Sequence, residues 1–150
     1  MLSSAGISVA LRPGWDVRIK HQEPSVPGSR RNALLHAATV PLPTDRGDYG
    51  SGVVDDLGPD DAFVALFEYD PEAAAQPLFE AVGLPVPSAA EFSPTAMQRP
   101  AGGRSGGQWF FHTAGRAFCV HIVLGSHARR VVSARRVAAL LRGISIGATS

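Results

Sequence analysis

A long and regular strand pattern covers residues 108–124 in the last third of the chain. From Phe118 onward, every second residue of its second half is large and apolar: Phe118, Val120, Ile122 and Leu124. A turn at Ala114-Gly115 separates this half from QWFFHT, in which Trp109 and Phe111 point the same way. Because successive side chains of a strand point to opposite faces of a sheet, the pattern predicts a β-hairpin with one apolar face.

Three earlier segments also carry strand patterns. Residues 7–20 alternate between apolar and polar on both sides of Pro13-Gly14, which predicts an opening β-hairpin. The run NALLHAATVPL is almost continuously small and apolar, which predicts a strand covered on both faces. The segment AFVALFEYD is the strongest strand of the chain, and we expect it at the centre of the sheet.

Helical signals before the last third of the chain are short. Spacing over residues 53–57 predicts a short helix that Gly58-Pro59 ends. Asp70 and Pro71 predict the cap and first position of a second helix, which Pro77 keeps short or broken. Many prolines and glycines between residues 85 and 107 predict mostly irregular chain.

A longer helix is predicted near the C-terminus. Ser133 is its expected N-cap and Gly143 its end, with a short edge strand at 144–146. Its apolar side consists of Ala134, Val137, Ala138 and Leu141. Hairpins with few helices between them predict an α+β fold: one domain over 1–150, with a mainly antiparallel sheet built from two hairpins plus central strands and helices packed on it.

Charge is distributed unevenly along the chain. From Thr44 to Glu91 there are eleven acidic residues and one arginine, and beyond Glu91 there are eight arginines and no acid. Such asymmetry bears on partners rather than on the fold. Either the acidic segment neutralises the later arginines inside one domain, or one of the two presents a charged surface.

The later arginines are the first candidate binding site. Around the C-terminal helix lie Arg129, Arg130, Arg135 and Arg136, with Arg142 at its end. Clustered guanidinium groups bind phosphate or nucleic acid because they donate several hydrogen bonds and release counterions. A sequence pI of about 8.0 and the lack of aromatic residues in this stretch argue against nucleic acid. The alternative is a solvated helix face that pairs with the acidic segment.

Cys119 is the second candidate. It alternates onto the same strand face as His121, and His36 or His112 joins them if the strands neighbour appropriately. A catalytic thiolate needs an activating base within hydrogen-bond reach, and zinc needs four ligands. One cysteine with scattered histidines meets neither requirement from sequence. The pattern therefore favours a buried structural cysteine and predicts no metal or cofactor, while an enzyme that uses Cys119 with a nearby histidine stays an alternative.

Two further motifs favour structural roles. Gly103, Ser105 and Gly107 match the GxSxG pattern of a nucleophile elbow, which requires a strand before the serine and a helix after it. Here irregular chain precedes the serine and a strand follows. The aspartates between Asp45 and Asp61 lack the spacing of a calcium loop, so we expect them at caps, turns and solvated positions.

The chain resembles a small family of uncharacterised actinobacterial proteins through PGWDVRI, NALLHAATVPLP, GDYGSGVVDDLGPDDAFVALFEYDP and AGRAFCVHIVLGS. That resemblance brings no activity. Through PGW, the late hairpin and the helix followed by a short strand, the chain is also distantly similar to the α/β/α sandwich of the extrinsic photosystem subunit P and its lipoprotein relatives. This second resemblance implies an accessory or binding protein without catalytic residues, and it transfers no site residue.

The expected location of the protein follows from two signals that the sequence lacks, a membrane helix and an export signal. No window approaches the roughly 18 to 20 apolar residues of a membrane helix, and residues 1–20 lack the pattern of an export signal. We therefore expect a soluble, cytoplasmic protein. The leading hypothesis is a non-enzymatic domain that binds a protein partner or self-associates. Phosphate or nucleic-acid binding through the arginines and catalysis through Cys119 are the alternatives.

Overall fold

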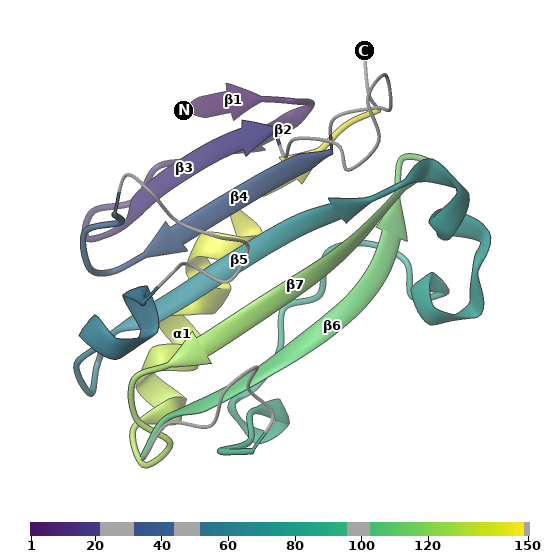
Figure 1. The fold of residues 1–150 in the computed structure, drawn as a ribbon. Helices are drawn as coiled ribbons and strands as arrows, with labels where there is room; N and C mark the ends of the chain where they lie inside the picture. The colour runs from purple at the N-terminus through teal and green to yellow at the C-terminus, as the bar shows by residue number, and fades with distance from the viewer. Residues whose placement is uncertain (22–31, 44–51, 96–102, 149–150) are drawn as a thin grey trace.

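Among the residues that the structure describes, five antiparallel strands form the main sheet, in the order β3-β4-β5-β7-β6 (Figure 1). They are β3 (Asp16–His21), β4 (Ala33–Ala38), β5 (Ala62–Tyr69), β6 (Ser105–Thr113) and β7 (Arg116–Leu124). The fold is that of a computed structural model, which describes residues 1–21, 32–43, 52–95 and 103–148.

In the described part of the chain, a smaller antiparallel sheet and one α-helix lie against the main sheet. The small sheet has the order β1-β2-β8 and consists of β1 (Leu2–Ser4), β2 (Ile7–Val9) and β8 (Ile144–Ile146). Helix α1 (Arg130–Arg142) lies behind the main sheet in Figure 1. The described residues also form short 3₁₀ helices: η1 (Val53–Asp56), η2 (Pro71–Ala75), η3 (Pro77–Phe79) and η4 (Ala89–Glu91). The predicted α+β class with mainly antiparallel sheet is confirmed.

Strands β6 and β7 form the late hairpin that the sequence predicts. Their register pairs Phe111 with Phe118 and Thr113 with Arg116. At the turn, Ala114 has φ 53° and Gly115 has φ 74°. Two successive residues with positive φ are what a type I′ turn requires, and this turn matches the twist of the strands that it joins.

The predicted hairpin over residues 7–20 is wrong. Strand β2 pairs with β1 and β8, whereas β3 pairs with β4. The N-terminal hairpin is β1–β2, with Ala5 (φ 55°) and Gly6 (φ 76°) at its turn. Pro13-Gly14 lies in the connection from the small sheet to the main sheet. The distant strand β8 takes the place beside β2 that the alternation pattern assigned to β3.

Both faces of the central part of the main sheet, strands β4, β5 and β7, are buried. The face covered by α1 and the small sheet includes Leu35, Val64, Leu66, Phe111, Phe118, Val120, Ile122, Val137 and Leu140. The opposite face packs with η1 and includes Leu34, Val53, Leu57, Phe63, Ala65, Phe67, Cys119 and Val123. All of β4 and nearly all of β5 are buried, and β5 is the middle strand. The doubly covered strand and the central strand are therefore confirmed.

The short helices follow the prediction, with one change at the second. η1 occupies the predicted helical segment, and Pro77 separates η2 from η3. Asp70 is at the N-cap position of η2, but its side chain makes no capping hydrogen bond. It accepts a 3.0 Å bond from Asn32 Nδ2 instead. The position of Asp70 is therefore right, and the predicted side-chain cap is wrong.

Helix α1 begins before the predicted cap. Arg129 occupies the N-cap position, so Ser133 lies inside the first turn and is buried, and the Ser133 cap is wrong. The start is set upstream, where the backbone oxygen of His127 accepts a bond from the amide of Arg130 at 3.2 Å. The predicted apolar side is buried, Gly143 ends the helix, and β8 is an edge strand, as predicted.

Residues 85–107 contain more regular structure than expected. η4 lies within them, and β6 already begins at Ser105. Ser93 pairs with Gly106 through two backbone bonds of 2.9 and 2.8 Å. This bridge joins the irregular segment to the edge of β6. Residues 96–102 lie outside the described part of the chain.

Candidate functional site

Two of the candidate arginines contact the acidic turn before β5. Arg129 Nε donates to the Asp60 carboxylate in an exposed ion pair, and Arg136 Nη1 donates a 2.6 Å bond to the Asp60 backbone oxygen. Arg130 Nη1 donates to the backbone oxygen of His127 at 2.9 Å. Exposed ion pairs stabilise a protein little. The contacts nevertheless bring the acidic segment and the arginine cluster together within one molecule.

Arg135 and Arg142 remain exposed on the solvent side of α1. Their spacing of seven residues puts them on the same side of the helix. One turn before Arg135, Val131 and Val132 are 51% and 46% exposed. Neither arginine forms an ion pair with another described residue. We call this set the basic–apolar surface: Val131, Val132, Arg135 and Arg142.

Cys119 is buried, and its surroundings disfavour the thiolate. Burial raises the pKa of Cys119 to about 12, and a backbone hydrogen bond at Trp109 opposes this shift only in part. A reactive thiolate requires a depressed pKa. On the same strand face, burial lowers the pKa of His121 to about 4. Near neutral pH both groups are therefore uncharged parts of the core.

The other two predicted histidines occupy different parts of this face. Strand pairing puts His36 and His121 in one row with β5 between them, about 10 Å apart at Cα for two strand spacings. His112 lies near the end of β6, where its Nδ1 contacts the backbone oxygen of Phe79. No three histidine, cysteine or acidic side chains of the described residues lie close enough to hold a metal ion.

The GxSxG match does not present a nucleophile. Ser105 is buried at the first position of β6, and a strand rather than a helix follows it. Its hydroxyl lies 2.9 Å from His127 Nδ1, a contact that the sequence did not predict. The amide of His127 also donates to the Gly103 oxygen at 2.7 Å. The serine–histidine pair therefore joins the start of β6 to the segment before α1.

Among the described aspartates, Asp61 has the predicted role of stabilising a turn. Asp61 accepts bonds from the Gly58 amide at 2.9 Å and from Thr39 Oγ1 at 2.8 Å. These bonds fix the turn that leads into β5. Asp45 and Asp48 lie outside the described residues.

Arg116 and Glu68 form a buried ion pair that sequence reasoning missed. Both side chains are 1% exposed. Arg116 Nε and Nη2 donate to the two carboxylate oxygens at 2.9 and 3.1 Å, and the amide of Ala33 donates a further 2.9 Å bond. The guanidinium carbon also lies 5.1 Å from the ring centroid of Phe118. Bidentate geometry and the added bonds compensate the desolvation of both charges.

The same guanidinium joins the two sheets. Arg116 Nη1 donates to the Gly147 oxygen at 2.9 Å, and the Gly147 amide donates to the Gly6 oxygen at 2.8 Å. A Cβ at Gly6 would lie 2.6 Å from Arg116 Nη1, so this turn needs glycine for space as well as for its positive φ. Alternation offered a signal, because Arg116 and Glu68 share the apolar face with Phe118. These contacts give the pair a structural role.

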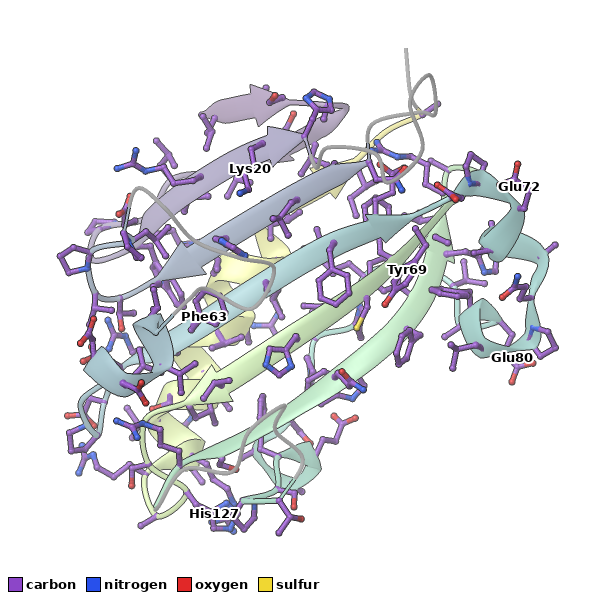
Figure 2. The ribbon with its side chains drawn as sticks, in the orientation of Figure 1. Lys20, Phe63, Tyr69, Glu72, Glu80 and His127 are labelled. Atoms are coloured by element: carbon purple, nitrogen blue, oxygen red, sulfur yellow. The ribbon has the colours of Figure 1, made fainter. Side chains whose placement is uncertain are left out.

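Large apolar side chains are exposed where the chain leaves β5 and passes beside β6. Leu78 is 59% exposed and Val82 is 79% exposed. Glu72 and Glu80 lie beyond Tyr69 at the right-hand end of Figure 2. Residues 52–95 contain no Lys, Arg or His. Further along the same stretch, Val86 is 38% exposed. We call this set the acidic–apolar surface: Glu72, Leu78, Glu80, Val82 and Val86.

This surface rests on a fixed segment. The buried ring of Phe79 packs edge-on against Phe110 and Tyr69, with centroids 5.6 and 5.1 Å apart. The amide of His112 donates to the Ala81 oxygen at 2.8 Å, and the His112 oxygen accepts a 2.9 Å bond from the Gly83 amide. The flanking side chains are therefore held outward. Sequence reasoning missed this surface because it treated the prolines here only as helix breakers.

Comparison with protein-family models, curated proteins and solved structures finds no match for the chain. Within the described ranges, no helix combines the length and apolar character needed to cross a bilayer. The two resemblances based on sequence motifs stay predictions. Function is therefore inferred from the side chains and surfaces of the chain itself.

Proposed function

We propose that the protein is a non-enzymatic binding domain that recognises another protein through the acidic–apolar surface. The observation that carries the proposal is the exposure of Leu78 and Val82 on a segment anchored by Phe79 and by backbone bonds to β6. Full burial of such a side chain contributes roughly 1.5–3 kcal/mol. Because the segment is already ordered, little conformational entropy is lost on binding.

The charges of the surface define the chemistry of the partner. Glu72 and Glu80 are exposed and form no ion pair with another described residue. Opposite charge across an interface favours encounter and disfavours wrong partners. The expected partner therefore presents basic side chains beside apolar ones, an arrangement found on basic amphipathic helices.

The two alternative functions have less support. Arg129 and Arg136 already contact Asp60, which leaves fewer free guanidinium donors for phosphate. The buried thiol of Cys119 has a raised pKa rather than the depressed pKa of a nucleophile. The cytoplasmic location predicted from sequence fits a binding domain of this kind.

A synthetic helical peptide tests the proposal. Its leucines follow helical spacing and its other positions are arginine or alanine, and a second peptide replaces arginine with glutamate. The basic peptide should bind the wild-type protein and shift the NMR methyl signals of Leu78, Val82 and Val86. Fluorescence anisotropy should show binding at least about tenfold weaker for a Leu78→Ser/Val82→Ser variant, because two apolar contacts are lost.

The control is Leu11→Ser, which removes an exposed apolar side chain at another place. This variant should bind the basic peptide as tightly as the wild type does. Equal binding of the basic and acidic peptides would contradict the proposed charge preference. Undiminished binding by the double serine variant would contradict the assignment of the surface.

A further inference from the structure

We infer that a second copy of this chain supplies the partner surface, and that the basic–apolar surface of one molecule docks on the acidic–apolar surface of another. This inference rests on the proposed function. The occupant of the acidic–apolar surface follows from its charge complementarity with the basic–apolar surface of the same chain.

Five of the exposed large apolar side chains of the described residues fall into two groups whose charged neighbours in sequence have opposite sign, while Met1 and Leu11 lie outside both groups. Leu78, Val82 and Val86 lie in a stretch without basic residues, whereas Val131 and Val132 lie in a stretch without acidic ones. Solubility alone does not require exposed apolar side chains to be separated according to the charge of the residues near them. Complementary fields beside apolar groups are instead typical of interfaces.

The charges that pair within the molecule differ from those on the two surfaces. Arg129 and Arg136 are bound to Asp60. Arg135 and Glu80 are exposed and form no ion pair with a described residue. The internal contact between the acidic segment and the helix therefore leaves charge of each sign available for a contact between molecules.

The two surfaces lie on different sides of one molecule. Helix α1 covers one face of the main sheet, whereas residues 71–79 lie beyond the C-terminal end of β5 (Figure 1). A contact between them therefore requires two copies. It is formed by two different patches, so it either repeats along a chain of molecules or closes by symmetry. The patches are small, so we expect weak, salt-sensitive association.

Charge reversal on each surface tests the inference. Glu72→Arg/Glu80→Arg makes both surfaces basic, and Arg135→Glu/Arg142→Glu makes both acidic. In low salt, sedimentation velocity over a concentration series should show association of the wild type. Each variant alone should associate at least about tenfold more weakly. An equal mixture of the two variants should regain wild-type association, because every contact again joins opposite charges.

Arg12→Glu/Lys20→Glu is the matched control, since it changes net charge as much as the second variant while leaving both surfaces intact. It should associate like the wild type.

Circular dichroism confirms folding, and the single changes Glu80→Arg and Arg135→Glu repeat the test if a double variant misfolds. A wild type that stays monomeric in low salt, or a mixture that fails to associate, overturns the inference. Peptide binding at the acidic–apolar surface would still stand in either case, so the two proposals fail separately.

Discussion

Replacing His121 with asparagine should make the stability of the protein less sensitive to mild acid. His121 is 2% exposed, and burial lowers its pKa from 6.5 to about 4. Between these values the unfolded chain binds a proton at this position and the folded chain does not. Stability is therefore complete above about pH 6.5 and falls as the pH is lowered toward 4.

The size of the effect follows from the two pKa values. At pH 5 the unfolded imidazole is mostly protonated and the folded one mostly neutral, which favours unfolding by about 2 kcal/mol relative to pH 7. Below pH 4 the loss approaches roughly 3 kcal/mol. Asparagine removes this titration. Any cost from the altered packing is independent of pH and cancels when the two pH values are compared.

Urea unfolding followed by tryptophan fluorescence measures this difference. The wild type should lose about 2 kcal/mol more unfolding free energy between pH 7 and pH 5 than His121→Asn does. His21→Gln, at an exposed histidine of β3, controls for the loss of a histidine as such. Equal losses for wild type and His121→Asn would refute the reasoning, as would an NMR titration in which native His121 protonates near pH 6.5.

Three further predictions concern the interior. Glu68→Gln should lower the free energy of unfolding by roughly 3–5 kcal/mol, because it leaves the buried Arg116 charge uncompensated. Glu68→Met with Arg116→Met should cost less in the same urea titration, and a larger cost for the double variant would contradict this account. Cys119 should resist iodoacetamide in the native protein at pH 8 and react after unfolding, as mass spectrometry can show; rapid native labelling would restore the thiol hypothesis. Gly125→Ala should destabilise the protein by at least about 2 kcal/mol, because its Cβ would lie 1.8 Å from the Gly58 oxygen. An unchanged melting temperature would show that this loop relaxes freely.

Alternation identified strands but did not identify their neighbours. β4, β5, β6 and β7 were predictable because each has a long apolar pattern, and β6 and β7 are joined by a two-residue turn that fixes their pairing. β2 has only three residues and pairs with β8 from the other end of the chain. The alternation of apolar and polar residues in a strand is the same whichever strand pairs with it. Proximity in sequence favours pairing β2 with β3, and this prediction is wrong because β2 pairs with β1 and β8.

The surfaces and polar contacts were less predictable than the strands. Alternation put Arg116 and Glu68 on an apolar face, so two opposite charges at inward positions could have been recognised as a pair. The Ser105–His127 bond had no such signal, because it depends on how β6 meets the segment before α1. The exposure of Val82 depends on a backbone bridge to His112 that no local pattern encodes.

The pairing of β2 with β8 also has a consequence for folding kinetics. Nearly the whole described chain must be looped between these strands before they can meet, so the contact carries a large closure entropy. Folding rates fall as such distant contacts become more common. We therefore expect the β6–β7 hairpin to form early and the small sheet to form last. During synthesis on a ribosome, β2 would lack its neighbour β8 until the residues after α1 had been translated.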